Sequence, residues 1–173
     1  MSAQTRTPKE PRSQRKTEAL SIRLDQRTKY GLELLGREQR RPVAGVAEWC
    51  IWESFRRETV RNYAGTPISL EKVLSELWLS SELERLITLG FIYPSLATFS
   101  DDRMFRVLVE TPELWTDATN VHSANSFKMR AILPRWEFLK PILVAASEGA
   151  RPLLPLSREE LASVGLSELV ANR

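Results

Sequence analysis

The side chains that most often carry catalysis or bind metals are scarce in this sequence. Its 173 residues include one histidine, His122, and one cysteine, Cys50. A single histidine and a single distant cysteine do not supply the ligand set of a zinc site. Cys50 falls on an apolar helical face, which predicts a buried thiol that acts as a small apolar side chain. We therefore expect no metal site and no cofactor.

Two pairs of carboxylates, Asp101–Asp102 and Glu159–Glu160, are adjacent in sequence. On a helix such neighbours point about 100° apart, so they do not converge on one substrate. Acidic residues in a first helical turn instead favour the helix dipole. The sequence also lacks a phosphate-binding glycine-rich loop and a nucleophile elbow. These features predict a protein that is not an enzyme.

Basic residues are concentrated at the N-terminal end. Residues 1–62 carry 14 Lys/Arg and 8 Asp/Glu, whereas residues 63–173 carry 11 and 14. A basic region on an acidic body favours a polyanion as its partner. Residues 1–17 hold two prolines, five basic residues and no large apolar side chain after Met1, which predicts a disordered basic arm.

Bulk properties favour a cytoplasmic protein with a packed core. The apolar share is 42%, close to that of ordinary globular domains. No window approaches the ~18 apolar residues that a membrane span needs. The charged N-terminus has no apolar segment of the secretory type, and one cysteine cannot form an intrachain disulfide, which favours a reducing compartment.

The segment EALSIRL, residues 18–24, alternates between apolar and other side chains. This period predicts a strand over 19–24 that places Leu20, Ile22 and Leu24 on one face. Ala19, Ser21 and Arg23 then share the other face. A helix over about 26–39 follows, with Asp25 as its N-cap. Arg40 and Arg41 form a turn.

Pro42 suits the start of a second helix, predicted over about 43–60. This helix is apolar on nearly all sides, so a second copy of the chain, the C-terminal region or both must bury it. Trp49 and Trp52 are expected to meet one of those surfaces. The five tryptophans, at positions 49, 52, 78, 115 and 136, are interpreted as packing residues rather than a ligand cage.

Residues 66–173 are predicted to form an all-helical domain after a connector over 62–68. Capping patterns predict helix starts at Ser69, Ser81, Ser100 and Ser157. Gly90 and Gly165 are expected to end helices. Prolines at 134 and 141 should break or kink the apolar stretch 127–148. The predicted helices are 70–79, a segment from 82 to about 90, 101–110 and a segment after 157, with a short turn from Thr111 to Trp115.

A lone strand leaves its backbone groups unpaired, and pairing with its own copy from a second chain would satisfy them. The resulting two-stranded ribbon fits the DNA major groove. Strand, helix, turn and helix over roughly residues 18–59 resemble the ribbon-helix-helix family of Arc- and MetJ-like repressors. The elements that carry this resemblance are ALSIRL, TKYGLELLGRE, RRPV and VAGVAEWCIWESFRRE.

The resemblance implies an intertwined dimer with specific site residues. Base readout falls on Ala19, Ser21 and Arg23, of which Arg23 can bond guanine bidentately. The positions that match the ionic triad of Arc are Arg41, Val46 and Cys50, so the triad is missing. Phosphate contacts are expected from Arg12, Arg15 and Lys16 of the arm, from Arg40 and Arg41, and from the backbone N–H groups of Val43 and Ala44. The expected dimer core comprises Leu20, Ile22, Leu24, Val43, Ala47, Ile51 and Phe55.

The sequence thus predicts a mainly α protein with a ribbon-helix-helix domain over 18–61 and a helical C-terminal domain over 66–173. The expected function is sequence-specific DNA binding by a dimeric transcriptional repressor at the nucleoid. Two alternatives stay open. One is an antitoxin whose C-terminal domain binds a toxin, and the other is an accessory factor for plasmid transfer or partition. The C-terminal domain is expected to mediate further oligomerisation, such as a tetramer, or to bind a protein partner.

Overall fold

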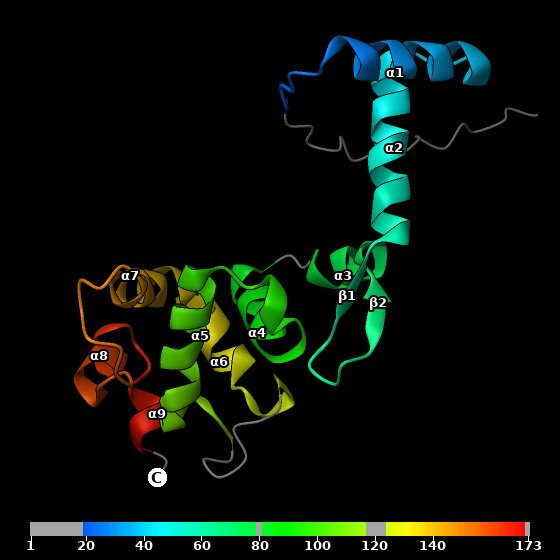
Figure 1. Cartoon of the computed structure of the whole chain (residues 1–173). Coiled ribbons are helices and arrows are strands. Elements are labelled where there is room, and N and C mark those ends of the chain that lie inside the picture. The colour runs from blue at the N-terminus through cyan, green and yellow to red at the C-terminus, as the bar shows by residue number, and fades with distance from the viewer. Residues whose placement is uncertain (1–18, 79–80, 117–123, 172–173) are drawn as a thin grey trace, which may run out of the picture. The chain divides into compact units, whose positions relative to one another are not determined.

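The computed structural model describes residues 19–78, 81–116 and 124–171 (Figure 1). The chain is mainly helical, with one two-stranded antiparallel sheet. Its contacts divide it into two compact units, residues 1–47 and residues 48–173. Among the described helices, none has the length and apolar character needed to cross a bilayer.

Helix α1, Gln26–Gln39, has the predicted bounds and the predicted cap. The carboxylate of Asp25 accepts a hydrogen bond from the backbone N–H of Thr28 at 3.0 Å. At the other end, Arg40 adopts the left-handed conformation with φ 52° and ψ 43°. The Arg41 N–H donates to the Gly36 carbonyl at 2.9 Å, and the Arg40 N–H donates to the Arg37 carbonyl at 3.3 Å. This is the bonding pattern of a Schellman motif, which usually places glycine at the left-handed position.

Helix α2, Val43–Arg57, starts where predicted but ends three residues early. The Pro42 carbonyl accepts the N–H of Val46 at 3.1 Å, so Pro42 caps the helix. After Glu58 the chain forms strand β1, Thr59–Arg61, which pairs with β2, Pro67–Ser69. The prediction that residues 66–173 are all helical is therefore wrong at β2.

The predicted connector over 62–68 is also wrong, because it is the turn of the hairpin and most of its second strand. The side-chain oxygen of Asn62 accepts the N–H groups of Ala64 and Thr66 at 3.0 and 2.9 Å. Gly65 follows with φ 77°, which only glycine adopts freely. Sequence periodicity missed this hairpin because each strand has only three residues.

Residues 19–24, predicted as a strand, have no regular secondary structure in the single chain. A strand is defined by its hydrogen bonds to another strand, and no described segment of the same chain pairs with these residues. The observed sheet thus differs from the predicted ribbon. Pairing between two copies stays a prediction.

The remaining elements form the bulk of the second unit (Figure 1). The α-helices are α3 Leu70–Leu77, α4 Glu82–Ile92, α5 Phe99–Glu110, α6 Met129–Ile132, α7 Trp136–Ser147, α8 Arg158–Ser163 and α9 Ser167–Ala171. Short 3-10 turns occupy Pro94–Leu96, Pro112–Leu114, Ala124–Ser126 and Leu133–Arg135.

Side-chain caps at Ser69, Ser81 and Ser157 confirm three of the predicted helix starts. The start predicted at Ser100 is wrong, because Thr98 caps α5 in a reciprocal box with Asp101. Pro134 breaks the stretch 127–148 as predicted, whereas Pro141 lies inside α7. Gly165, at φ 78°, follows α8 as expected.

Gly90 does not end α4, which continues to Ile92. A Cβ atom built at Gly90 would lie 2.4 Å from the ring of Phe105. Gly90 therefore lets α5 approach α4 closely, which is a packing role rather than a helix stop. The Phe105 ring in turn meets Phe91 edge to face at a centroid distance of 4.9 Å.

The core of the second unit lies among α4, α5 and α7. Trp115 is 2% exposed, and its indole N–H donates to the Leu108 carbonyl at 2.9 Å. Its ring packs edge to face against Phe91 and Phe127. Leu139 and Leu143, on the inner side of α7, are completely buried.

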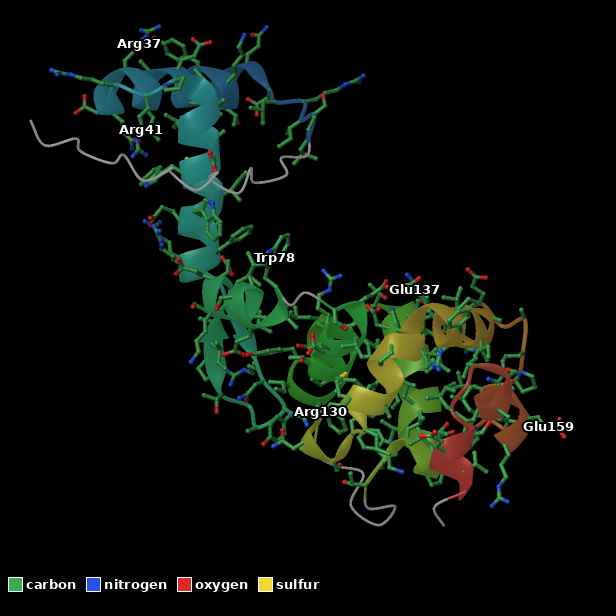
Figure 2. All side chains as sticks on the ribbon, turned by 180° about the vertical axis from the view of Figure 1, so that it is seen from behind. Arg37, Arg41, Trp78, Arg130, Glu137 and Glu159 are labelled. Carbon is green, nitrogen blue, oxygen red and sulfur yellow. The ribbon has the colours of Figure 1, made fainter. Side chains whose placement is uncertain are left out.

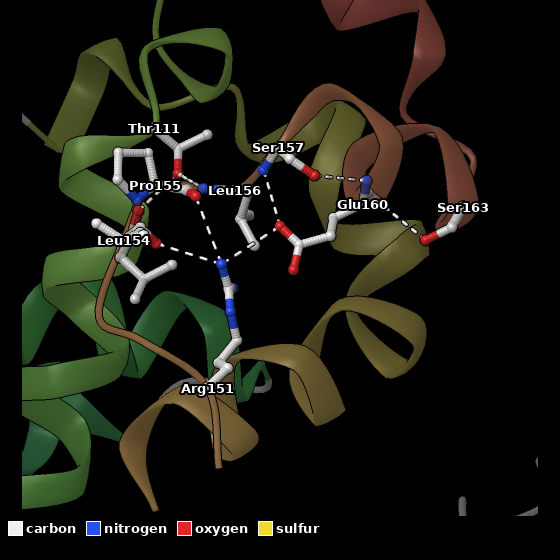
Figure 3. Close-up of polar contacts among 9 residues, drawn as sticks. Thr111, Arg151, Leu154, Pro155, Leu156, Ser157, Glu160 and Ser163 are labelled. Atoms are coloured by element: carbon white, nitrogen blue, oxygen red, sulfur yellow. Dashed lines mark hydrogen bonds and ion pairs between the residues drawn. The ribbon is translucent and has the colours of Figure 1, made fainter. Parts of the chain in front are cut away.

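The segment between α7 and α8 is held in place by polar contacts (Figure 3). One nitrogen of Arg151 reaches the carbonyls of Leu154 and Pro155 at 3.5 Å and a carboxylate oxygen of Glu160 at 3.3 Å. The buried hydroxyl of Thr111 accepts the Leu156 N–H at 2.9 Å. These bonds fix the C-terminal segment against the end of α5.

The hairpin and α3 are joined to α4 by two contacts. The Tyr63 N–H donates to the Ile92 carbonyl at 2.9 Å. The Tyr93 hydroxyl donates to the carboxylate of Glu76. Burial, reinforced by this carboxylate, raises the pKa of Tyr93 to about 12.

Candidate nucleic-acid interface

The predicted DNA-reading segment lies on the surface of the chain. Each residue from 19 to 25 is exposed, including Ala19, Ser21 and Arg23. The alternating apolar residues are exposed as well, with Leu20 at 79%, Ile22 at 59% and Leu24 at 47%. Three large apolar side chains at every second position thus remain about half exposed or more within the described part of the chain, which leaves them available to a second copy.

Arg40 and Arg41 are both exposed at the turn between the helices. Figure 2 shows Arg37 and Arg41 on opposite sides of α1. Val43 and Ala44 open α2, so their N–H groups have no carbonyl partner within the helix. The turn thus places two exposed arginines immediately before the positive end of a helix dipole, and this combination of charges can bind phosphate.

Gly36 allows this turn to fold back on α1. A Cβ atom at Gly36 would lie 3.0 Å from the Arg41 carbonyl oxygen and 3.8 Å from a methyl group of Val46. Val46 is completely buried, and Gly36 is the buried residue of α1. The close approach of these two residues anchors the start of α2 against the end of α1.

Alanine at Gly36 and alanine at Gly31 are expected to change stability in opposite directions. A Cβ atom at Gly31 would meet nothing within 4 Å, so Gly31→Ala should stabilise the fold by about 0.5–1 kcal/mol through helix propensity. At Gly36 the strain against backbone, about 1–3 kcal/mol, should exceed that gain. Urea unfolding of both variants measures the difference. A higher midpoint for Gly36→Ala than for the parent protein would contradict the close contact.

The residues predicted as dimer core are not buried in the single chain. Val43 is 41% exposed and Ile51 is 42% exposed, while Ala47 and Phe55 are partly exposed. Cys50 is half-buried rather than fully buried, which corrects that expectation. Exposed apolar residues that recur along one helix are typical of an interface with another protein.

The interpretation of the five tryptophans as packing residues is only partly right for the single chain. Trp115 and Trp136 lie in the core. Trp52 is 39% exposed and meets Phe55 edge to face at 5.5 Å, and Trp49 is half-buried. Trp78, at the end of α3, is 79% exposed (Figure 2). Periodicity alone cannot tell a core face from a face that is left open.

Some predicted residues lie outside the described part of the chain. These are the arm residues Arg12, Arg15 and Lys16, and the single histidine, His122. In the described part, no three His, Cys, Asp or Glu side chains gather closely enough to hold a metal ion.

Sequence patterns gave no sign of a polar cluster in the second unit. The carboxylate of Glu82 accepts bonds from the Lys140 ammonium at 2.7 and 2.9 Å and from the Trp136 indole N–H at 3.2 Å. The bond from Lys140 lowers the pKa of Glu82 despite the opposing effect of burial. Trp136 and Lys140 lie 54 and 58 positions from Glu82 in the sequence, so no local pattern indicates these contacts.

Comparison with protein-family models, with curated proteins and with solved structures finds no significant match to this chain. The fold and the positions of the exposed residues are therefore the basis for assigning a class of function.

Proposed function

We propose that the protein is a sequence-specific DNA-binding dimer that represses transcription. The observation that carries the proposal is the alternation of residues 19–24, in which three exposed apolar side chains alternate with Ala19, Ser21 and Arg23. Antiparallel pairing of two copies would bury the apolar side chains and satisfy the backbone groups of both segments. The other face of the ribbon would then carry two copies of Ser21 and Arg23 towards the major groove.

The turn before α2 supports the same proposal. Arg40 and Arg41 provide positive charge beside the first N–H groups of α2, where a DNA phosphate would be stabilised. Phosphate contacts of this kind position a protein on the duplex without reading its sequence. In this proposal, Arg23 on the ribbon contacts the bases, whereas the turn before α2 binds the DNA phosphates.

Arg23→Ala is expected to weaken binding to a selected DNA site much more than binding to random DNA. A bidentate contact to guanine contributes about 1–3 kcal/mol of discrimination, or roughly 5- to 150-fold. The site is first selected from a random DNA pool, and fluorescence anisotropy then measures both affinities at one salt concentration. Arg37→Ala is the matched control, since it removes the same charge from an exposed position on α1, outside the segment 19–24.

Equal losses of specific and non-specific affinity in Arg23→Ala would assign Arg23 to a phosphate and contradict base readout. Failure to select any DNA site would contradict the proposed function itself. Repression is tested separately, with a reporter promoter that carries the selected site.

Arg40→Gly is expected to stabilise the protein and weaken its DNA binding. Arg40 is the one described non-glycine residue with positive φ, and glycine relieves that strain by about 1 kcal/mol. The substitution also removes one proposed phosphate contact from each copy of the dimer, so the slope of log affinity against log salt concentration should become shallower by about two. Thermal unfolding and DNA titration at several salt concentrations measure the two effects. A variant with unchanged affinity would exclude Arg40 from the phosphate contacts.

A further inference from the structure

A pocket of about 220 Å³ opens where α4, α5 and α7 converge in the second unit. Its apolar surface comes from Leu89 on α4, Met104 on α5 and Trp136 on α7. Trp136 is fixed there because its indole N–H donates to Glu82. An apolar pocket between helices with a few polar groups at its edge is the usual form of a small-molecule site.

Some charged residues at the rim of this pocket form ion pairs or hydrogen bonds with other described residues, and others have groups that remain unpaired. Glu82 and Lys140 bind each other and neutralise their charges. The guanidinium of Arg85 acts on Glu82 through its charge but makes no hydrogen bond or ion pair with any described residue. Only one carboxylate oxygen of Asp101 is engaged, by the N–H and the hydroxyl of Thr98 at 3.0 and 2.7 Å. Within the described residues, the rim thus offers one free cation and one free carboxylate oxygen, on different helices.

We propose that this pocket binds a free α-amino acid with an apolar side chain. Arg85 would hold the ligand carboxylate through charge-assisted hydrogen bonds, and Asp101 would accept bonds from its ammonium group. The apolar side chain would pack on Leu89, Met104 and Trp136. An anion or a cation alone would satisfy only one of the two rim groups, whereas a zwitterion satisfies both. The pocket volume of about 220 Å³ is sufficient for one amino acid.

Calorimetric titration of the full chain with L-leucine and L-phenylalanine tests the proposal. Saturable binding is expected in the range up to about 10 mM. 3-Phenylpropionate lacks the ammonium group and phenethylamine lacks the carboxylate, so each should bind at least about tenfold more weakly than phenylalanine. Absence of saturable binding by both amino acids, or equal binding of either analogue, would overturn the assignment.

Two variants locate the site. Arg85→Gln should weaken binding at least about tenfold, because it removes a charged partner of the carboxylate. Arg158→Gln is the matched control, since Arg158 is an exposed residue at the start of α8, and it should bind as the parent protein does. Asp101→Asn keeps an oxygen for the cap at Thr98 and should weaken binding of phenylalanine but not of 3-phenylpropionate. Unchanged affinity in Arg85→Gln, with an unchanged melting temperature, would place any bound ligand elsewhere.

Discussion

Ile22→Asp is expected to convert the protein to a monomer and to abolish specific DNA binding. Ile22 is the middle residue of the alternating apolar trio, and its side chain is 59% exposed in the single chain. In the proposed ribbon, the Ile22 side chains of both copies would be buried. Two carboxylates placed there would lose their hydration and repel each other, at a cost of at least about 3 kcal/mol, or more than 100-fold in dimer affinity.

Sedimentation velocity and DNA titration measure these two effects on the same sample. Ser21→Asp is the matched control, because it places the same charge on the opposite face of the segment. That variant should remain dimeric and lose DNA binding through repulsion by the phosphates. An Ile22→Asp protein that stays dimeric would show that residues 19–24 do not form the dimer contact, and the DNA-reading face would lose its support.

Trp115→Ala is expected to destabilise the second unit by about 3–5 kcal/mol, the largest effect on stability that we predict. The substitution leaves a cavity between Phe91 and Phe127 and leaves the Leu108 carbonyl without the indole donor. Trp78→Ala is the control, since its side chain is 79% exposed and should change stability by less than about 0.5 kcal/mol. Urea unfolding followed by far-UV circular dichroism measures both variants.

Similar losses for the two tryptophan variants would contradict the burial that the structure assigns to them. A small loss for Trp115→Ala alone would mean that the aromatic cluster around Phe91 does not hold α4 and α5 together. Measurements at several protein concentrations separate this effect from any change in self-association.

Local rules predicted several helix starts because a side-chain cap and its backbone partner lie only three residues apart. Asp25 and Ser157 lie where their side chains accept backbone N–H groups, and the sequence shows both the acceptor and its distance from the donor. Pro134 breaks its helix for an equally local reason. The start of α1 followed from such a signal at Asp25, whereas its C-terminal cap at Arg40 did not.

Contacts between distant segments could not be predicted in the same way. In the sequence, Gly90 has the position of a residue that ends a helix. Its packing role depends on the ring of Phe105, which lies 15 positions later in the chain. Lys140 and Glu82 are 58 positions apart, and their pairing follows from the packing of α7 on α4. For the candidate DNA interface, the sequence identified the exposed alternation at residues 19–24, but the left-handed Arg40 has no signal, since its neighbours would suit an ordinary turn.

Few residues of α1 and α2 are buried. We therefore expect the folding of the N-terminal region to depend on the concentration of the protein in the cell. In the two helices only Gly36 and Val46 are buried, whereas the elements from α4 onwards share a large core. If the ribbon forms as proposed, the apolar residues of the N-terminal elements are buried only in the dimer. The stability of these elements then depends on protein concentration. Halving the cellular level of the chain would then reduce its DNA-competent form by more than half, and a gradual change in synthesis would produce a sharper change at the promoter.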